Sequence, residues 1–230
     1  MKIDRFTQTP FQQNTRVVSC ENTRQAICID PGEQSSALED HIRSNGLGLI
    51  AIALTHGHLD HVGGTAALHR AFPEAEIIIH EQDEELYFAL QKQPLFMGIR
   101  PEQLSLLGLD YEAPPRPTRN WQDGEIFEVG DLRFSVRHSP GHTRGHVVLA
   151  ETAEKVVFVG DCLFENSIGR TDLPGGDHAQ LLDSIARNIL SLDDDVKVYS
   201  GHGPVTTVGR ERRHNPFLNG TYQLERGRFI

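Results

Sequence analysis

The sequence predicts an α/β protein in which two halves pack sheet against sheet with helices outside, a four-layer α/β/β/α sandwich. Short apolar runs alternate with helix-like segments in both halves. A proline-dense stretch, residues 113–118, separates the halves and is interpreted as the crossover, because proline suits neither a helix interior nor a central strand. We therefore expect a single domain over residues 1–230, built from two similar halves.

The first half contains three apolar runs that are typical of strands. They are predicted at residues 25–30, 49–54 and 76–80. The second run is apolar almost throughout, which is typical of a strand buried on both faces. Helices are expected at residues 36–43, 66–71 and 84–91.

The second half repeats this organisation. Strands are predicted at residues 125–129, 132–138, 146–151, 155–159 and 196–200. A helix is predicted at about residues 179–192, with Asp177 as its N-cap.

Composition narrows the class of protein. Of 230 residues, 38% are hydrophobic and 23% charged, as in ordinary soluble globular proteins. A net charge of -10 argues against nucleic acid as the partner, since phosphate binding needs a basic face. Cys20, Cys28 and Cys162 have no disulfide or metal-site spacing and are expected to be reduced. With neither a signal peptide nor a membrane-length apolar run, we expect a cytoplasmic protein without a membrane partner.

The most informative segment is Thr55–His61, which contains four side chains able to bind metal. His56, His58, Asp60 and His61 follow one another in the spacing H-x-H-x-D-H. Neutral imidazoles and carboxylates suit zinc, iron and related divalent metals. Four such ligands from one short segment exceed what one structural zinc usually takes, which indicates two metal ions or one ion with an open position.

Metal-binding residues also follow other predicted strands. Residues 132–137 lead to His142, residues 156–159 to Asp161 and residues 196–199 to His202, each beside a glycine. Because α/β folds build sites at strand ends and glycine permits sharp turns, we expect these side chains to converge with the His56–His61 cluster. His146 is interpreted as a support for the ligands. The remaining histidines are interpreted as surface or structural, namely His41, His69, His80, His138, His178 and His214.

These motifs resemble those of the metallo-β-lactamase superfamily. The ordered set is Thr-His-x-His-x-Asp-His at Thr55–His61, Gly-His-Thr at Gly141–Thr143, Gly-Asp at Gly160–Asp161 and Gly-His-Gly at Gly201–Gly203. The resemblance spans nearly the whole chain and implies the α/β/β/α sandwich with its site at one edge.

Within the superfamily, the chain is most similar to short glyoxalase II-type hydrolases. G-H-T-R-G-H at residues 141–146 and G-D-C-L-F at residues 160–164 carry this similarity. It implies two divalent metal ions, zinc first and iron or manganese as alternatives. The first ion would be held by His56, His58 and His142, and the second by Asp60, His61 and His202, with Asp161 bridging them. Asp60 and Asp161 are then the expected catalytic carboxylates.

The resemblance implies hydrolysis of a small-molecule thioester, S-(2-hydroxyacyl)glutathione, by a metal-bound hydroxide. Arg170 is the expected contact for substrate carboxylates, and the basic group Arg210, Arg212 and Arg213 is either a second anion contact or a solvated charged face. Two alternatives stay open. Gly169–Asp172, with the sequence G-R-T-D, also resembles the iron-dependent persulfide dioxygenases, and other metal-dependent ester or lactone hydrolases share the ligands. The oligomeric state is left open.

Overall fold

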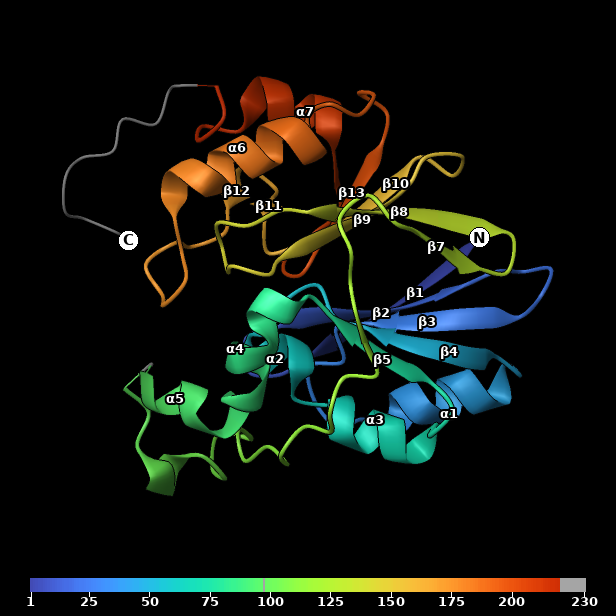
Figure 1. Cartoon of the computed structure of the whole chain (residues 1–230), viewed down its shortest axis with the longest axis vertical. Helices are drawn as coiled ribbons and strands as arrows, with labels where there is room; N and C mark the ends of the chain where they lie inside the picture. The colour runs from blue at the N-terminus through green and yellow to red at the C-terminus, as the bar shows by residue number, and fades with distance from the viewer. Residues whose placement is uncertain (97, 220–230) are drawn as a thin grey trace.

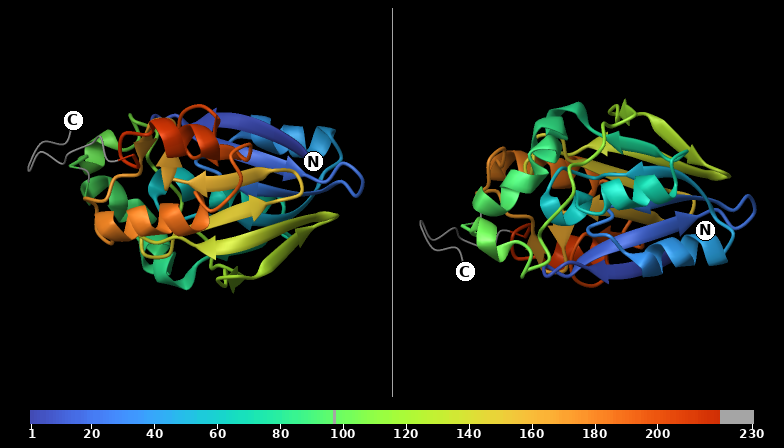
Figure 2. Two further views of the ribbon diagram at one scale, coloured as in Figure 1. Left: turned by 90° about the horizontal axis from the view of Figure 1, so that it is seen from above. Right: turned by 90° about the horizontal axis from the view of Figure 1, so that it is seen from below.

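Two six-stranded sheets face each other and helices cover their outer faces, as the computed structural model shows for residues 1–96 and 98–219 (Figure 1). The predicted α/β/β/α sandwich is therefore confirmed. Seen from above, α6 and α7 lie over the second sheet, and from below α1 and α3 lie under the first (Figure 2). In the described residues, no helix combines the length and the apolarity that crossing a lipid bilayer requires.

The first sheet has the order β1-β2-β3-β4-β5-β6. Its strands are β1 (Lys2–Gln8), β2 (Gln13–Ser19), β3 (Gln25–Ile29), β4 (Gly48–Ala53), β5 (Glu76–Ile79) and β6 (Arg119–Asn120). The strands β3 to β6 run parallel, and β1 and β2 join them in antiparallel pairs.

The second sheet has the order β14-β13-β10-β9-β8-β7. Its strands are β7 (Ile126–Val129), β8 (Leu132–His138), β9 (Val147–Glu151), β10 (Val156–Gly160), β13 (Lys197–Ser200) and β14 (Thr206–Thr207). A small hairpin, β11 (Leu163–Phe164) with β12 (Ser167–Ile168), follows β10. The chain passes from the first sheet to the second between Asn120 and Ile126, after the proline-dense segment 113–118.

The helices connect these strands. They are α1 (Ser36–Ser44), α2 (Leu59–Val62), α3 (Thr65–Ala71), α4 (Glu84–Phe88), α5 (Gln93–Phe96), α6 (His178–Asn188) and α7 (Val208–His214), with short 3-10 turns at η1 (Glu81–Asp83), η2 (Leu90–Lys92) and η3 (Pro101–Gln103). Asp177 caps α6 by accepting the N–H of Gln180, as predicted.

The core has three apolar layers, and alternation along the strands explains them. In β4, Ile52 packs in the layer between the first sheet and its helices, whereas Ala51 and Ala53 point into the layer between the sheets. The third layer joins the second sheet to α6 through residues such as Val157 and Ile185. Each sheet is thus buried on both faces, which accounts for the continuous apolar runs of its central strands.

The structure differs from the sequence-based predictions in several elements, and the short elements α5, α7, β6, β11, β12 and β14 were not predicted. The strands β1 and β2 were not predicted, because their sequences are too polar to show a strand pattern. The predicted helix over residues 84–91 ends at Phe88 and continues as a 3-10 turn. The helix α6 ends at Asn188 rather than at residue 192. All three cysteines are free and buried, as expected for reduced thiols.

Trp121 connects the core to the metal-binding motif, and its replacement tests that connection. Its ring is buried between the sheets, and its indole N–H donates to the carbonyl of Leu54 at 3.0 Å, directly before Thr55. Trp121→Phe should lower the free energy of unfolding by about 1–3 kcal/mol, because the buried Leu54 carbonyl loses its donor. Urea unfolding followed by circular dichroism measures this; a loss below about 0.5 kcal/mol would contradict the stated role.

Candidate metal centre

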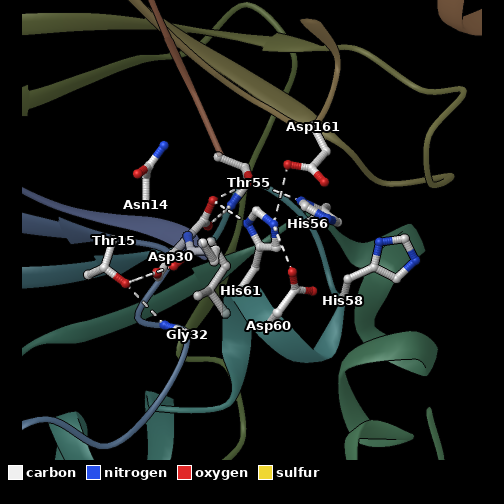
Figure 3. A network of polar contacts seen from close by, with 12 residues as sticks. Asn14, Thr15, Asp30, Gly32, Thr55, His56, His58, Asp60, His61 and Asp161 are labelled. Carbon is white, nitrogen blue, oxygen red and sulfur yellow. Dashed lines mark hydrogen bonds and ion pairs between the residues drawn. The ribbon is translucent and has the colours of Figure 1, made fainter. Parts of the chain in front are cut away.

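Strand β4 delivers the H-x-H-x-D-H motif to one edge of the sandwich. After Ala53 the chain turns so that His56 and His58 precede the four-residue helix α2, which carries Asp60 and His61. Figure 3 shows His56, Asp60 and His61 below Asp161, with His58 to one side. The structure therefore brings all four donors of the motif, which come from one short segment, beside a carboxylate from the second sheet.

The first donor group contains His56, His58 and His142. Their ligand atoms lie within 4.8 Å of one another. His58 Nδ1 is 2.9 Å from His142 Nε2, although these residues come from different sheets. Three neutral imidazoles in this arrangement suit zinc or iron.

The second donor group contains Asp60, His61 and His202, again within 4.8 Å. His202 Nε2 lies 3.2 Å from Asp60 Oδ2 and 3.4 Å from His61 Nε2. The Asp161 carboxylate lies between the two groups, with Oδ1 3.3 Å from His61 Nε2 and Oδ2 3.7 Å from His142 Nε2. The seven predicted ligands are thus brought together as two groups with a shared carboxylate.

Two buried polar atoms in this centre accept no hydrogen bond, which tests whether a metal fits. They are Nε2 of His56 and Oδ1 of Asp161, and the latter faces His61 Nε2 at 3.3 Å without hydrogen-bond geometry. A buried polar atom without a partner costs free energy, and both atoms belong to types that bind divalent metals. The donor set and its unpaired atoms therefore fit metal binding.

The second nitrogen of most of these histidines is engaged elsewhere. His142 Nδ1 contacts the Arg170 carbonyl at 2.8 Å, and His202 Nδ1 contacts the Phe11 carbonyl at 3.0 Å. His56 Nδ1 lies 3.0 Å from Thr55 Oγ1. Such contacts select the tautomer and aim Nε2 into the centre.

Asp30 makes the corresponding contact for His61. Its Oδ2 lies 2.9 Å from His61 Nδ1 and accepts the Thr55 hydroxyl at 2.7 Å, while Oδ1 accepts the Thr55 N–H at 2.7 Å (Figure 3). Asp30 also falls within 4.8 Å of His56 and His61 donors, but its oxygens are occupied by these bonds. We therefore interpret Asp30 as a support for His61 and not as a third metal position.

Gly201 is required by the close approach of the loops. A Cβ atom at this position would lie 2.3 Å from Asp161 Oδ1 and 2.6 Å from His61 Cε1. Any larger residue would separate the β13 loop from the other ligands. The glycine that the sequence places before His202 thus has a steric role in the centre.

The electrostatics differ between the two donor groups. Burial and the neighbouring His142 lower the pKa of His58 to about 3, and burial and His61 lower the pKa of His56 well below its ordinary value. Burial would also lower the pKa of His61, but Asp161 and Asp60 raise it well above its ordinary value. The first group is therefore neutral near pH 7, whereas in the second group the carboxylates of Asp60 and Asp161 favour the protonated form of His61, and a binding metal ion would displace that proton.

The other sequence-predicted residues have the following positions. Cys162 is buried in the core, and His146 Nε2 accepts the Asp161 N–H at 3.1 Å, so His146 supports the loop as expected. The remaining six histidines join neither donor group in the described part of the chain. Asp30 and Asp83, both buried carboxylates beside the motif loops, were not predicted. Asp30 had a signal, a carboxylate at a strand end beside Pro31-Gly32, whereas Asp83 had none.

A pocket of about 320 Å³ opens onto the donors. His58, Asp60, His142, Asp161 and His202 lie in its lining. Its other walls are mainly apolar, formed by Phe11, Leu59, Leu86, Leu173 and Pro174. The combination of apolar walls with a few convergent polar groups is typical of a small-molecule site.

The predicted anion contacts differ in position. Arg170 lines the pocket, but its guanidinium forms two bonds to Asp172, at 2.7 and 2.8 Å. Arg212 and Arg213 pair with Asp194, and Arg210 pairs with Glu165. These three arginines do not line the pocket, which favours the charged-face interpretation for them.

Comparison with known proteins agrees with this architecture. The model of the metallo-β-lactamase superfamily matches residues 8–202. The chain belongs to this superfamily. The predicted resemblance is thereby confirmed, and it covers the span that contains all seven candidate ligands.

Several superfamily members align with almost the whole chain. The hydroxyacylglutathione hydrolase GloC of Haemophilus influenzae is 39% identical over 221 residues, covering 95% of this chain and 99% of that protein. The crystal structure of TTHA1623 in a di-iron-bound form has 37% identity and a TM-score of 0.81, covering 94% of this chain and 100% of that one. The BLEG-1 B3 metallo-beta-lactamase has 35% identity and a TM-score of 0.82, covering 95% and 100%.

Asp30→Asn tests the support of His61. The asparagine amide has one oxygen and one NH2 group in place of two carboxylate oxygens. Its NH2 group would face either His61 Nδ1 or a Thr55 donor, so His61 Nε2 should no longer be held toward the metal position. We expect metal affinity at the second donor group to fall by about 10–100-fold, as for other residues that orient ligands. Elemental analysis and metal titration of the purified variant measure this; wild-type affinity for two ions would refute the role of Asp30.

The lowered pKa of His58 predicts a pH dependence for the metal-free protein. Between about 3 and the ordinary 6.5, the unfolded chain binds a proton that folded His58 does not. His58 therefore makes the folded state less stable as pH falls through this range. From about pH 7.5 to about pH 5, His58→Gln should lose less free energy of unfolding than the wild type. Urea unfolding in a chelator measures this, and equal losses would contradict the expected shift.

Proposed function

We propose that the protein is a metal-dependent hydrolase that cleaves S-(2-hydroxyacyl)glutathione, such as S-D-lactoylglutathione, into glutathione and the hydroxy acid. The observation that carries the proposal is the convergence of two donor groups and the shared Asp161 beside one pocket, in whose lining members of both groups lie. The similarity to a hydroxyacylglutathione hydrolase over 95% of the chain supports the choice of substrate.

The proposed ligands are His56, His58 and His142 for one divalent ion, and Asp60, His61 and His202 for the other, with Asp161 shared. Zinc is the first candidate, and iron or manganese are alternatives, because such ligands accept all three. The di-iron form of TTHA1623 supports iron as a serious alternative. When bound, the ions would lower the pKa of a water molecule and polarise the acyl carbonyl.

The chain's own residues then orient the reactants. Asp60 lines the pocket, and its Oδ2 lies 3.2 Å from His202 Nε2, so its other carboxylate oxygen would accept a hydrogen bond from the attacking water. The apolar walls formed by Leu59 and Leu86 exclude water from the rest of the pocket. A thiolate is a good leaving group, so the reaction needs no general acid of the kind that an amide requires.

Arg170 is proposed to bind a carboxylate of the substrate at the pocket. Its side chain is 53% exposed and already paired with Asp172. A substrate carboxylate would share the guanidinium with Asp172 or displace it. The proposed contact is therefore weaker than that of an unpaired arginine, and its contribution belongs to substrate affinity rather than to the chemical step.

A second candidate is β-lactam hydrolysis, which the similarity to BLEG-1 favours. It would use the same ions and the same bound water. Iron-dependent persulfide oxidation is a further alternative for the G-R-T-D segment, and it differs from both hydrolyses because it consumes oxygen. One purified, metal-analysed sample assayed with the thioester, a β-lactam and glutathione persulfide in an oxygen electrode separates all three functions.

The hydrolase proposal makes a specific prediction. Asp161→Ala should lower kcat/KM for S-D-lactoylglutathione by more than about 100-fold, because it removes the shared ligand. Arg170→Ala should raise KM up to about tenfold with little change in kcat. Arg187→Ala is the matched control, since Arg187 is an exposed arginine paired with Asp183 on the outer helix α6. A metal-loaded wild type that leaves the thioester intact would refute the proposal.

A further inference from the structure

The buried carboxylate of Asp83 joins the two loops that carry the first donor group. Asp83 is 1% exposed and ends the 3-10 turn η1. Its Oδ2 accepts the Gly57 N–H at 2.9 Å and the Thr143 hydroxyl at 2.6 Å, and its Oδ1 accepts the Gly145 N–H at 2.6 Å. Three donors from two loops therefore converge on one carboxylate.

Two of these donors are next to metal-binding histidines in the sequence. Gly57 separates His56 from His58 in the loop after β4, which belongs to the first sheet. Thr143 follows His142 in the loop after β8, which belongs to the second sheet. Asp83 is thus bonded to a neighbour of each of the three histidines in the first donor group.

Close packing around Asp83 leaves little freedom for either loop. A Cβ atom on Gly145 would lie 2.6 Å from the Asp83 nitrogen and 2.9 Å from its Cγ. A Cβ atom on Gly57 would lie 3.0 Å from the Asp83 carbonyl oxygen. The glycines of both motifs let the two loops approach the carboxylate. Motif residues that bind no metal thus affect the positions of the residues that do.

We propose that Asp83 is a positioning residue that sets the separation of His58 and His142, and thereby controls metal binding by His56, His58 and His142. The inference rests on the proposed metal centre. In this inference Asp83 positions the first donor group, whereas Asp30 contacts His61 in the second. Asp30 reaches the first group only through the Thr55 hydroxyl, which lies 3.0 Å from His56 Nδ1.

Asp83→Asn tests the assignment. An amide has one acceptor oxygen, and its NH2 group would face one of the two N–H donors or the Thr143 hydroxyl. Metal titration and elemental analysis should show that one of two ions binds about 10–100-fold more weakly, while the other keeps its affinity. Glu211→Gln is the matched control, because Glu211 is also buried and accepts the Asn166 N–H at 2.8 Å and the Thr206 hydroxyl at 2.5 Å. This control should keep both ions.

A second pair of variants decides the question if Asp83→Asn does not fold. Thr143→Val removes the hydroxyl that donates to Asp83 and should weaken the same ion, whereas Thr143→Ser keeps the hydroxyl and should restore its affinity. The inference would be overturned if Thr143→Val and any folded Asp83→Asn bound both ions with wild-type affinity. It would also be overturned if Glu211→Gln lost as much metal affinity as Asp83→Asn.

The outcomes separate this inference from the proposed function. Wild-type protein that binds two ions but leaves S-D-lactoylglutathione intact would overturn the proposed substrate, and the metal affinities of the variants would still decide the role of Asp83. Wild-type protein that binds no zinc, iron or manganese would overturn both.

Discussion

A buried imidazole can bind a metal only if one nitrogen is unprotonated and aimed at the ion, and this constraint organises the site. His56, His61, His142 and His202 each engage Nδ1 with another group and present Nε2 to the centre. His58 differs, since its Nδ1 faces His142. Because these partners are protein atoms, the fold itself restrains the orientation of these imidazoles, which reduces the cost of ordering the ligands.

The partners come from distant parts of the fold, so the two-sheet architecture is needed for more than the core. The carbonyl that engages His202 belongs to the connection between β1 and β2, in the first sheet. The β13 loop is also bonded to that sheet, because the Asn14 N–H donates to the Gly201 carbonyl at 2.7 Å. Packing of one sheet on the other therefore aligns ligand and support at the same time, and loss of interfacial packing would misplace the donors.

The sequence predicted those elements whose signal is local. Strands β4 and β10 are apolar throughout, and β8 and β13 alternate polar with apolar residues. Each of the four is followed by glycine and a metal-binding residue, so both the strands and the ligand loops were predicted. The strand β2 was missed because Gln13 and Arg16 are polar yet buried. Arg16 donates to the Asn14 carbonyl of its own strand and lies 5.2 Å from the ring centroid of Tyr199, a tertiary contact that the sequence does not show.

The supports of the ligands could be predicted only in part, for a physical reason. Asp30 follows a strand and precedes Pro31-Gly32, a context equally typical of a turn and of a ligand loop. Asp83 lies in an acidic segment whose composition is typical of the solvent-exposed start of a helix. The three groups that donate hydrogen bonds to it are 26, 60 and 62 residues away in the sequence. Hydrogen bonds over such separations depend on the packing of whole elements. A metal-binding motif therefore specifies which atoms can bind, whereas the fold determines whether they are aimed together.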